Sequence, residues 1–315
     1  MKILSPVDNL AEVDALIDAG ADELYGGYVS GGWAKKYSIM SSANQRYFPS
    51  AQIQGEAELK GIIKVAHSGG ARFYLTLNAP YYTEEQYGDI TREAREFSGM
   101  GVDAFIVADI GLILRLKDAM PYVDVHLSTL SEVFNGRAAS FYSRLGVRRM
   151  VLPRELTTAE MAGIIKAHPE LDFDAFILVG KCPNIEGYCS FTHNNPKLIW
   201  PCEEPYQMEA LADDGRTGGI IRAQSGWSSV NRRQACGLCA LPMLVRAGIT
   251  ALKLVGRGGP TGMKVKAIGA VKRVLGLVED GMDEGGVRPM AMGVYKELFG
   301  QDCNPYVCYF PEVWR

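Results

Sequence analysis

Residues 2–26, KILSPVDNLAEVDALIDAGADELYG, contain one complete unit of the pattern that decides the fold. The run from Lys2 to Pro6 predicts a strand, and AEVDALIDAG predicts an amphipathic helix that ends at Gly20. A second strand is predicted from Glu23 to Gly26. Strand, helix and strand in this order are typical of a parallel sheet covered by helices. The same unit recurs along the chain.

Eight strand candidates follow one another, with a helical stretch or a long loop between each pair. They are Lys2 to Pro6, Glu23 to Gly26, Phe73 to Asn78, Ala104 to Ala108, Val123 to Leu127, Arg149 to Leu152, Phe173 to Val179 and Ala251 to Val255. Eight strands suit a closed barrel, and 315 residues are within the range of single α/β barrels. We therefore expect a TIM-type (β/α)8 barrel over residues 1–281, with a tail docked on it over residues 282–315.

The composition describes an ordinary globular protein, because 47% of the residues are hydrophobic and 22% are charged. A net charge of -3 gives no general attraction to nucleic acid, so an RNA partner would require a local basic patch. No run approaches the ~20 apolar residues of a membrane helix. The first residues do not resemble a secretory leader. We expect a cytoplasmic protein that does not contact a membrane.

Two segments, 28–55 and 180–232, are too long for simple turns and follow the second and seventh predicted strands. Barrels place their active sites at the carboxyl ends of strands, so we expect the functional site between these segments. The second one, with the turn after it, holds five of the seven cysteines: Cys182, Cys189, Cys202, Cys236 and Cys239. Clustered thiols in a reducing compartment favour a metal centre, and their spacing leaves zinc and iron-sulfur open.

Two other interpretations of the cysteines stay open at this point. They could be small buried hydrophobic residues, or one could be a catalytic thiol, for which His126 and His193 are the histidines in reach. Cys303 and Cys308 could hold a second metal, supply an alternative ligand, form a redox pair or belong to a docked tail.

Three stretches resemble signatures of peptidase family U32, and together the likeness covers about residues 1–280. They are LSPVDNLAEVDALIDAGADELYGG (4–27), LVGKCPNIEGYCSF (178–191) and CGLCALPMLVRAGITALKLVGR (236–257). The family spacing places a cysteine six residues before Pro242, which selects Cys236 rather than Cys239. The resemblance thus implies a 4Fe-4S cluster on Cys182, Cys189, Cys202 and Cys236.

The resemblance also implies an activity. Better understood members act as oxygen-independent hydroxylases on ubiquinone precursors or RNA bases, with prephenate as oxygen donor. The chain looks like the short ubiquinone-pathway type, which works as a heterodimer, so a paralogous partner or a homodimer is expected with a small or ring-containing substrate. The family's histidine before Gly180 and its glutamate at Val255 are both missing, so the substrate or the reaction could differ.

Two alternatives to a hydroxylase are a collagenase-like peptidase and a non-catalytic cluster-binding subunit. The sequence contains neither a G-x-S-x-G nor an H-E-x-x-H motif, which speaks against known peptidase chemistry.

Polar residues at the ends of the predicted strands are the candidates for substrate chemistry. The predicted catalytic residues are Tyr25, Asn78, His126, Arg154 and Glu155, and Asp109, Ser128, Lys253 and Arg257 lie at the same edge. Any one of them could instead be a structural partner. The turn Arg257-Gly258-Gly259 precedes a helix and predicts an anion site for a dicarboxylate such as prephenate, with Arg154 and Arg257 as clamps. The alternative is that its glycines only make a tight turn.

Overall fold

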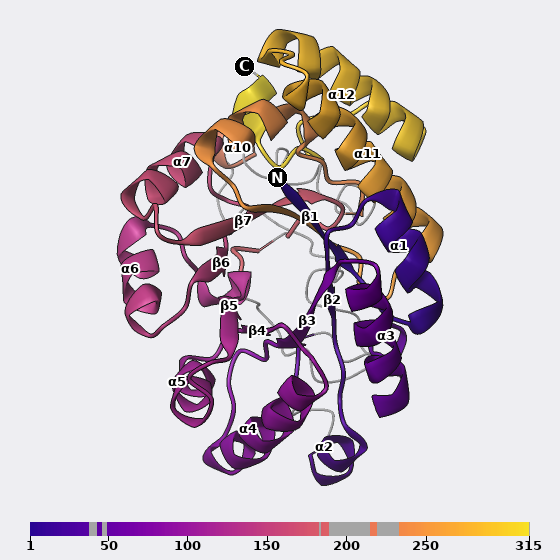
Figure 1. The fold of residues 1–315 in the computed structure, drawn as a ribbon. Coiled ribbons are helices and arrows are strands. Elements are labelled where there is room, and N and C mark those ends of the chain that lie inside the picture. Colours follow the sequence, from indigo (N-terminus) through magenta and orange to yellow (C-terminus); the bar gives the residue numbers. More distant parts are fainter. Residues whose placement is uncertain (38–42, 46–48, 183, 189–214, 219–232, 315) are drawn as a thin grey trace.

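The computed structural model describes residues 1–37, 43–45, 49–182, 184–188, 215–218 and 233–314. In these ranges eight parallel strands form a closed barrel in chain order, which confirms the predicted TIM-type fold (Figure 1). The strands are β1 Lys2–Pro6, β2 Glu23–Gly26, β3 Arg72–Leu77, β4 Ala104–Val107, β5 Asp124–Leu127, β6 Arg149–Val151, β7 Asp172–Leu178 and β8 Ala251–Leu254. Each agrees with its predicted range to within one residue at either end.

Helices surround the barrel on its outside (Figure 1). They are α1 Val13–Ala19, α2 Gly31–Lys36, α3 Glu56–Ser68, α4 Glu84–Gly99, α5 Ile110–Ala119, α6 Gly136–Arg144, α7 Thr158–Ala167, α10 Leu241–Ala247, α11 Thr261–Glu279 and α12 Glu284–Phe299. Local sequence sets several boundaries: Thr83 and Thr157 form capping boxes, and Gly20 ends α1 in a left-handed conformation. Among the described helices, none is long and apolar enough to span a membrane.

The C-terminal residues pack against the barrel. The helix α12 contacts α11 and the short helix η4, Leu238–Ala240. Beyond α12, Val307, Tyr309 and Phe310 are buried in the main core. Cys236 forms isolated bridges to Leu178, the last residue of β7, on one side and to Cys308 on the other, so the tail is joined to the carboxyl end of β7 through Cys236.

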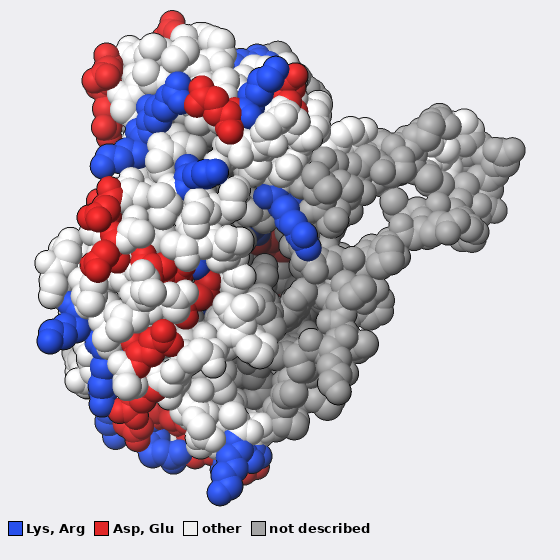
Figure 2. Space-filling view, turned by 90° about the vertical axis from the view of Figure 1, so that its right-hand side faces the viewer, with Lys and Arg blue, Asp and Glu red and all other residues white. Residues whose placement is uncertain are grey.

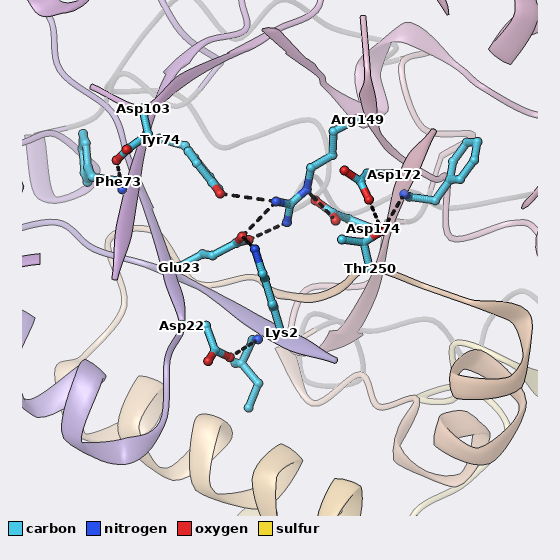
Figure 3. A network of polar contacts seen from close by, with 12 residues as sticks. Lys2, Asp22, Glu23, Phe73, Tyr74, Asp103, Arg149, Asp172, Asp174 and Thr250 are labelled. Atoms are coloured by element: carbon cyan, nitrogen blue, oxygen red, sulfur yellow. Dashed lines mark hydrogen bonds and ion pairs between the residues drawn. The ribbon is translucent and has the colours of Figure 1, made fainter. Parts of the chain in front are cut away.

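The interior of the barrel is polar toward the amino ends of its strands (Figure 3). Arg149 of β6 donates from Nε to both carboxylate oxygens of Asp174, at 2.9 and 3.0 Å. Its two terminal nitrogens donate to the two carboxylate oxygens of Glu23, at 2.9 and 2.5 Å. Tyr74 accepts a further hydrogen bond from Arg149 at 3.3 Å, and Lys2 pairs with Glu23 at 3.0 Å. The guanidinium of Arg149 thereby joins β6 to three other strands, β2, β3 and β7.

Both carboxyl groups of this network are buried, but their pKa values move in opposite directions. Burial opposes ionisation of Glu23, yet the hydrogen bonds and charge of Arg149 outweigh it and lower the pKa to about 2. Burial dominates at Asp174 and raises its pKa to about 6, in spite of Arg149. Without Arg149, both carboxylates would lack their main counter-charge.

We predict that Arg149→Met lowers the free energy of unfolding by about 3–5 kcal/mol, because it leaves two buried carboxylates uncompensated. The loss should shrink as pH falls toward 5, since the unpaired acids then have raised pKa values and the folded state binds protons more tightly than the unfolded state. Denaturant unfolding at several pH values measures both effects. The control Glu23→Gln/Arg149→Met/Asp174→Asn should recover much of the stability, and a single variant as stable as the wild type would contradict the prediction.

Candidate functional site

A pocket of about 170 Å³ opens at the carboxyl ends of the strands. It is smaller than the ~300–1,000 Å³ usual for drug-sized ligands, and so it suits a single ring or a small acid. The side chains of Tyr25, Phe176 and Lys253, from β2, β7 and β8, line it together with residues from the loops above. The predicted position of the site therefore coincides with a cavity in the part of the chain that the structure describes.

Seven of the residues that the sequence analysis singled out line this pocket: Tyr25, Asn78, Ser128, Arg154, Cys182, Lys253 and Arg257. The Tyr25 hydroxyl donates to the carbonyl oxygen of Leu254 at 2.8 Å, which fixes the ring against β8. Asn78 accepts from the backbone N–H of Gln45 at 3.2 Å. The structure thus brings these side chains to one cavity, while their catalytic roles stay predictions.

The Arg154 side chain is held by a carboxylate that the sequence analysis did not single out, that of Glu186. Arg154 donates from its guanidinium to Glu186 Oε1, and its backbone N–H donates to Glu186 Oε2 at 2.9 Å. Thr129 donates to the same carboxylate at 3.1 Å. The guanidinium also lies 3.6 Å from the ring centroid of Phe176. The sequence signal was an acidic residue four positions after Cys182, close to basic residues that need a counter-charge.

His126 and Glu155 do not line the pocket. His126 lies deeper in the barrel, with its ring 4.5 Å from that of Tyr74 and with a buried Nδ1 that has no partner among the described residues. Burial, and then the charge of Arg149, lower the pKa of His126, so the ring is neutral at pH 7. Glu155 accepts from the backbone N–H of Glu186 at 3.1 Å, which places it behind the pocket wall.

The predicted anion site lies in a turn whose groups already have partners. Gly258 N–H donates to Asp8 at 2.6 Å, and Gly259 N–H donates to the carbonyl of Gly256 at 2.9 Å. Arg257 donates to Thr76 at 3.2 Å and to the carbonyl of residue 51 at 2.5 Å, which ties the segment after α2 to the barrel. An anion at this turn stays a prediction.

The chain leaves β7 through two consecutive residues in the left-handed region, Val179 with φ 61° and Gly180 with φ 78°. This conformation is an outlier for a β-branched residue such as valine. It is held by hydrogen bonds from Val179 N–H to the carbonyl of Ala235 at 2.8 Å and from the Tyr309 hydroxyl to the carbonyl of Val179. The sharp turn brings Lys181 and Cys182 to the pocket wall.

Two of the four predicted cluster ligands, Cys189 and Cys202, lie outside the described residues. Cys182 lines the mouth pocket, whereas Cys236 lines a second, smaller cavity. Within the described ranges, no three His, Cys, Asp or Glu side chains are arranged to hold a metal ion. The thiols have the right donor chemistry for a soft metal, but the described residues do not show which four would bind it.

The second cavity, of about 20 Å³, is lined by four cysteines: Cys236, Cys239, Cys303 and Cys308. All four are free thiols, and burial raises the pKa of Cys239 to about 11. Their pattern, C-x2-C followed by C-x4-C, includes the close pairs typical of thiolate metal sites. The tail cysteines are therefore part of a thiol-lined cavity, and their role stays a prediction.

The face seen in Figure 2 shows Lys and Arg side chains interspersed with Asp and Glu side chains. Over the described residues of this face there is no continuous basic area. Among the described residues that line the pocket, four are basic, namely Arg154, Lys181, Lys253 and Arg257, and one is acidic, Glu186. The pocket thus favours an anionic ligand on charge alone.

Comparison with known proteins shows to which family the chain belongs. The sequence pattern of peptidase family U32 matches residues 8–310. A tRNA hydroxylation protein P of Haemophilus influenzae is 29% identical over 228 residues, 70% of this chain and 46% of that protein. A 23S rRNA 5-hydroxycytidine synthase of Escherichia coli is 28% identical over 223 residues, 69% of this chain and 31% of that protein. The chain spans less than half the length of these two relatives.

Among solved structures, a putative dihydrodipicolinate synthetase from Pseudomonas aeruginosa superposes with a TM-score of 0.51. The match covers 95% of this chain and 81% of that one, at 9% sequence identity. At this identity the likeness concerns the barrel fold alone.

We predict that Glu186→Ala lowers the free energy of unfolding by about 3 kcal/mol, because it leaves the buried guanidinium of Arg154 without its carboxylate. Thermal and denaturant unfolding measure the loss. The double variant Arg154→Met/Glu186→Ala should be more stable than Glu186→Ala, since the unpaired charge is then gone. Equal stabilities of the two variants would mean that the ion pair does not hold the pocket wall.

Proposed function

Because the chain belongs to peptidase family U32, we propose that it is an iron-sulfur-dependent enzyme that hydroxylates a ring-containing substrate without molecular oxygen. The family match carries the proposal, since the related proteins are named for the hydroxylation of tRNA and rRNA. Further support comes from the position of Cys182, which lines a pocket at the barrel mouth, where barrel enzymes carry their active sites.

The chain's own residues would perform binding and orientation. Arg154 and Lys253 supply positive charge in the pocket, and the rings of Tyr25 and Phe176 offer flat apolar surfaces to a ring. We propose prephenate or a related acid as the oxygen donor, since its carboxylates match that charge. An iron-sulfur cluster on cysteine thiolates would supply electron transfer.

The proposed cluster ligands remain Cys182, Cys189, Cys202 and Cys236. Cys239, Cys303 and Cys308 line the second cavity beside Cys236, but no three of the described side chains are arranged to hold a metal ion, so these thiols are not proposed as a ligand set. Cys182 and Cys239 are therefore the two positions that test the proposed ligands.

We predict that the anaerobically purified protein is brown and contains iron and acid-labile sulfide. Cys182→Ala should lose both, whereas Cys239→Ala should keep them. The reverse result would contradict the proposed ligand set. A colourless protein with stoichiometric zinc and no iron would contradict an iron-sulfur enzyme.

RNA is the first substrate class to test, because the related proteins are named for the hydroxylation of tRNA and rRNA. Nucleosides of tRNA and rRNA from a strain lacking the gene should lose one hydroxylated species, which the wild-type gene restores and Cys182→Ala does not. Unchanged nucleosides would direct the search to small ring compounds and to a paralogous partner, which co-purification would reveal. Proteolysis that persists without the four proposed ligands would favour a peptidase instead.

A further inference from the structure

Lys253 is a buried lysine on the inner face of the barrel. It lies in β8, two residues after Ala251, and alternate residues of a strand face the same side. Ala251 packs with Tyr25 and Tyr74 in the apolar cluster inside the barrel. Lys253 lies one layer higher, where it lines the mouth pocket with 6% of its surface exposed.

The ammonium group of Lys253 has no hydrogen bond or ion pair with any residue in the described ranges. Its Nζ lies 4.4 Å from the ring centroid of Tyr25 and 5.9 Å from that of Phe176. Lys264, which is equally buried, pairs with Asp8 at 2.6 Å and with Glu12 at 2.7 Å. Buried lysines are rarely left without such partners, because an unpaired buried charge is costly.

Asp174 is the carboxylate whose charge affects the pKa of Lys253 most. It does not pair with Lys253, because Arg149 binds both carboxylate oxygens of Asp174 (Figure 3). Burial lowers the pKa of Lys253 to about 8, and Arg149 and Arg154 add to this effect while Asp174 opposes it. The lowered pKa brings the neutral amine form of Lys253 closer to neutral pH than that of an exposed lysine. A desolvated lysine beside cationic groups is the type that acts as a nucleophile toward carbonyl compounds.

We propose that Lys253 forms a Schiff base with the keto group of a 2-oxo acid bound in the mouth pocket. The neutral Nζ attacks the carbonyl carbon, so a C–N bond forms and the carbonyl oxygen becomes a hydroxyl group. That oxygen then leaves as water, and a protonated imine remains. The step consumes one proton and involves no oxidation or reduction.

The charge of the pocket selects an acid over a neutral ketone. Besides Lys253, three basic residues of the described chain line it, namely Arg154, Lys181 and Arg257, and the described lining contributes one carboxylate, that of Glu186. Glu186 is already paired with Arg154. A ligand carboxylate would therefore restore charge balance in the pocket. The inference concerns the pocket of the proposed hydroxylase, but imine formation requires neither the cluster nor hydroxylation.

The test is reductive trapping of the full-length protein with pyruvate and sodium cyanoborohydride, followed by intact-mass measurement and peptide mapping. We expect one adduct per chain, on Lys253, formed faster with pyruvate than with acetone. Lys253→Met should lose the adduct, and Lys60→Met, which changes an exposed lysine of α3 outside the pocket, should keep it.

Several outcomes would overturn the proposal. These are no adduct on the wild-type protein, adducts spread over surface lysines, or an adduct that maps to another residue. Equal labelling by acetone would overturn the choice of a 2-oxo acid. Mapping on the wild-type chain decides the matter even if Lys253→Met fails to fold. Trapping that succeeds in protein without iron would separate this inference from the proposed hydroxylase activity.

The pH dependence gives a second test. Because only the neutral amine attacks, the trapping rate should rise as pH increases and level off above about 8, the pKa of Lys253. A rate that kept rising toward pH 10 would indicate an ordinary exposed lysine. The groups that set this pKa surround Lys253 from the neighbouring elements: Tyr25, Arg149, Arg154, Asp174, Phe176 and Glu186.

Discussion

The guanidinium of Arg149 between Glu23 and Asp174 is the interaction on which the site depends. It satisfies two buried carboxylates that face each other across the barrel and links β2, β6 and β7. Because Asp174 is occupied in this way, it does not neutralise Lys253 in the layer above. The amino-terminal half of the barrel interior is thus held together by ion pairs of Arg149. In the half nearer the mouth, Lys253 lines the pocket.

The wall of the pocket is built from interactions between distant segments. Glu186 ties the segment after β7 to Arg154 after β6, while Arg257 ties the segment after α2 to β3 through Thr76. The left-handed backbone at Val179 and Gly180 directs the chain over the mouth between them. These contacts are polar and are made by loop residues, so the mouth can differ between relatives while the barrel below stays the same.

The strands were predictable from sequence because each is a short apolar run bounded by turn residues, and eight such runs leave few alternatives to a barrel. Tyr25, Asn78, Arg154 and Arg257 were also predictable, because residues just after parallel strands meet at one edge. Three features were not predictable. His126 lies within β5 rather than beyond its end, and its side chain is buried below the mouth of the barrel. Glu186 contributes to the pocket wall only through the fold, because Arg154, its partner, is 32 residues away in the sequence. The backbone bridge between Cys236 and Cys308 depends on the docking of the C-terminal tail, which no periodicity in the sequence predicts.

The bridge from Cys236 to Cys308 also has a consequence for biosynthesis. All eight strands of the barrel have been translated by Leu254, but Cys236 gains its neighbour in the tail only when residues 307–309 have left the ribosome. Until then the thiols of Cys236 and Cys239 lack the cover of the tail. If the barrel closes before the tail emerges, a factor that delivers a ligand to these two cysteines would have that interval in which to act.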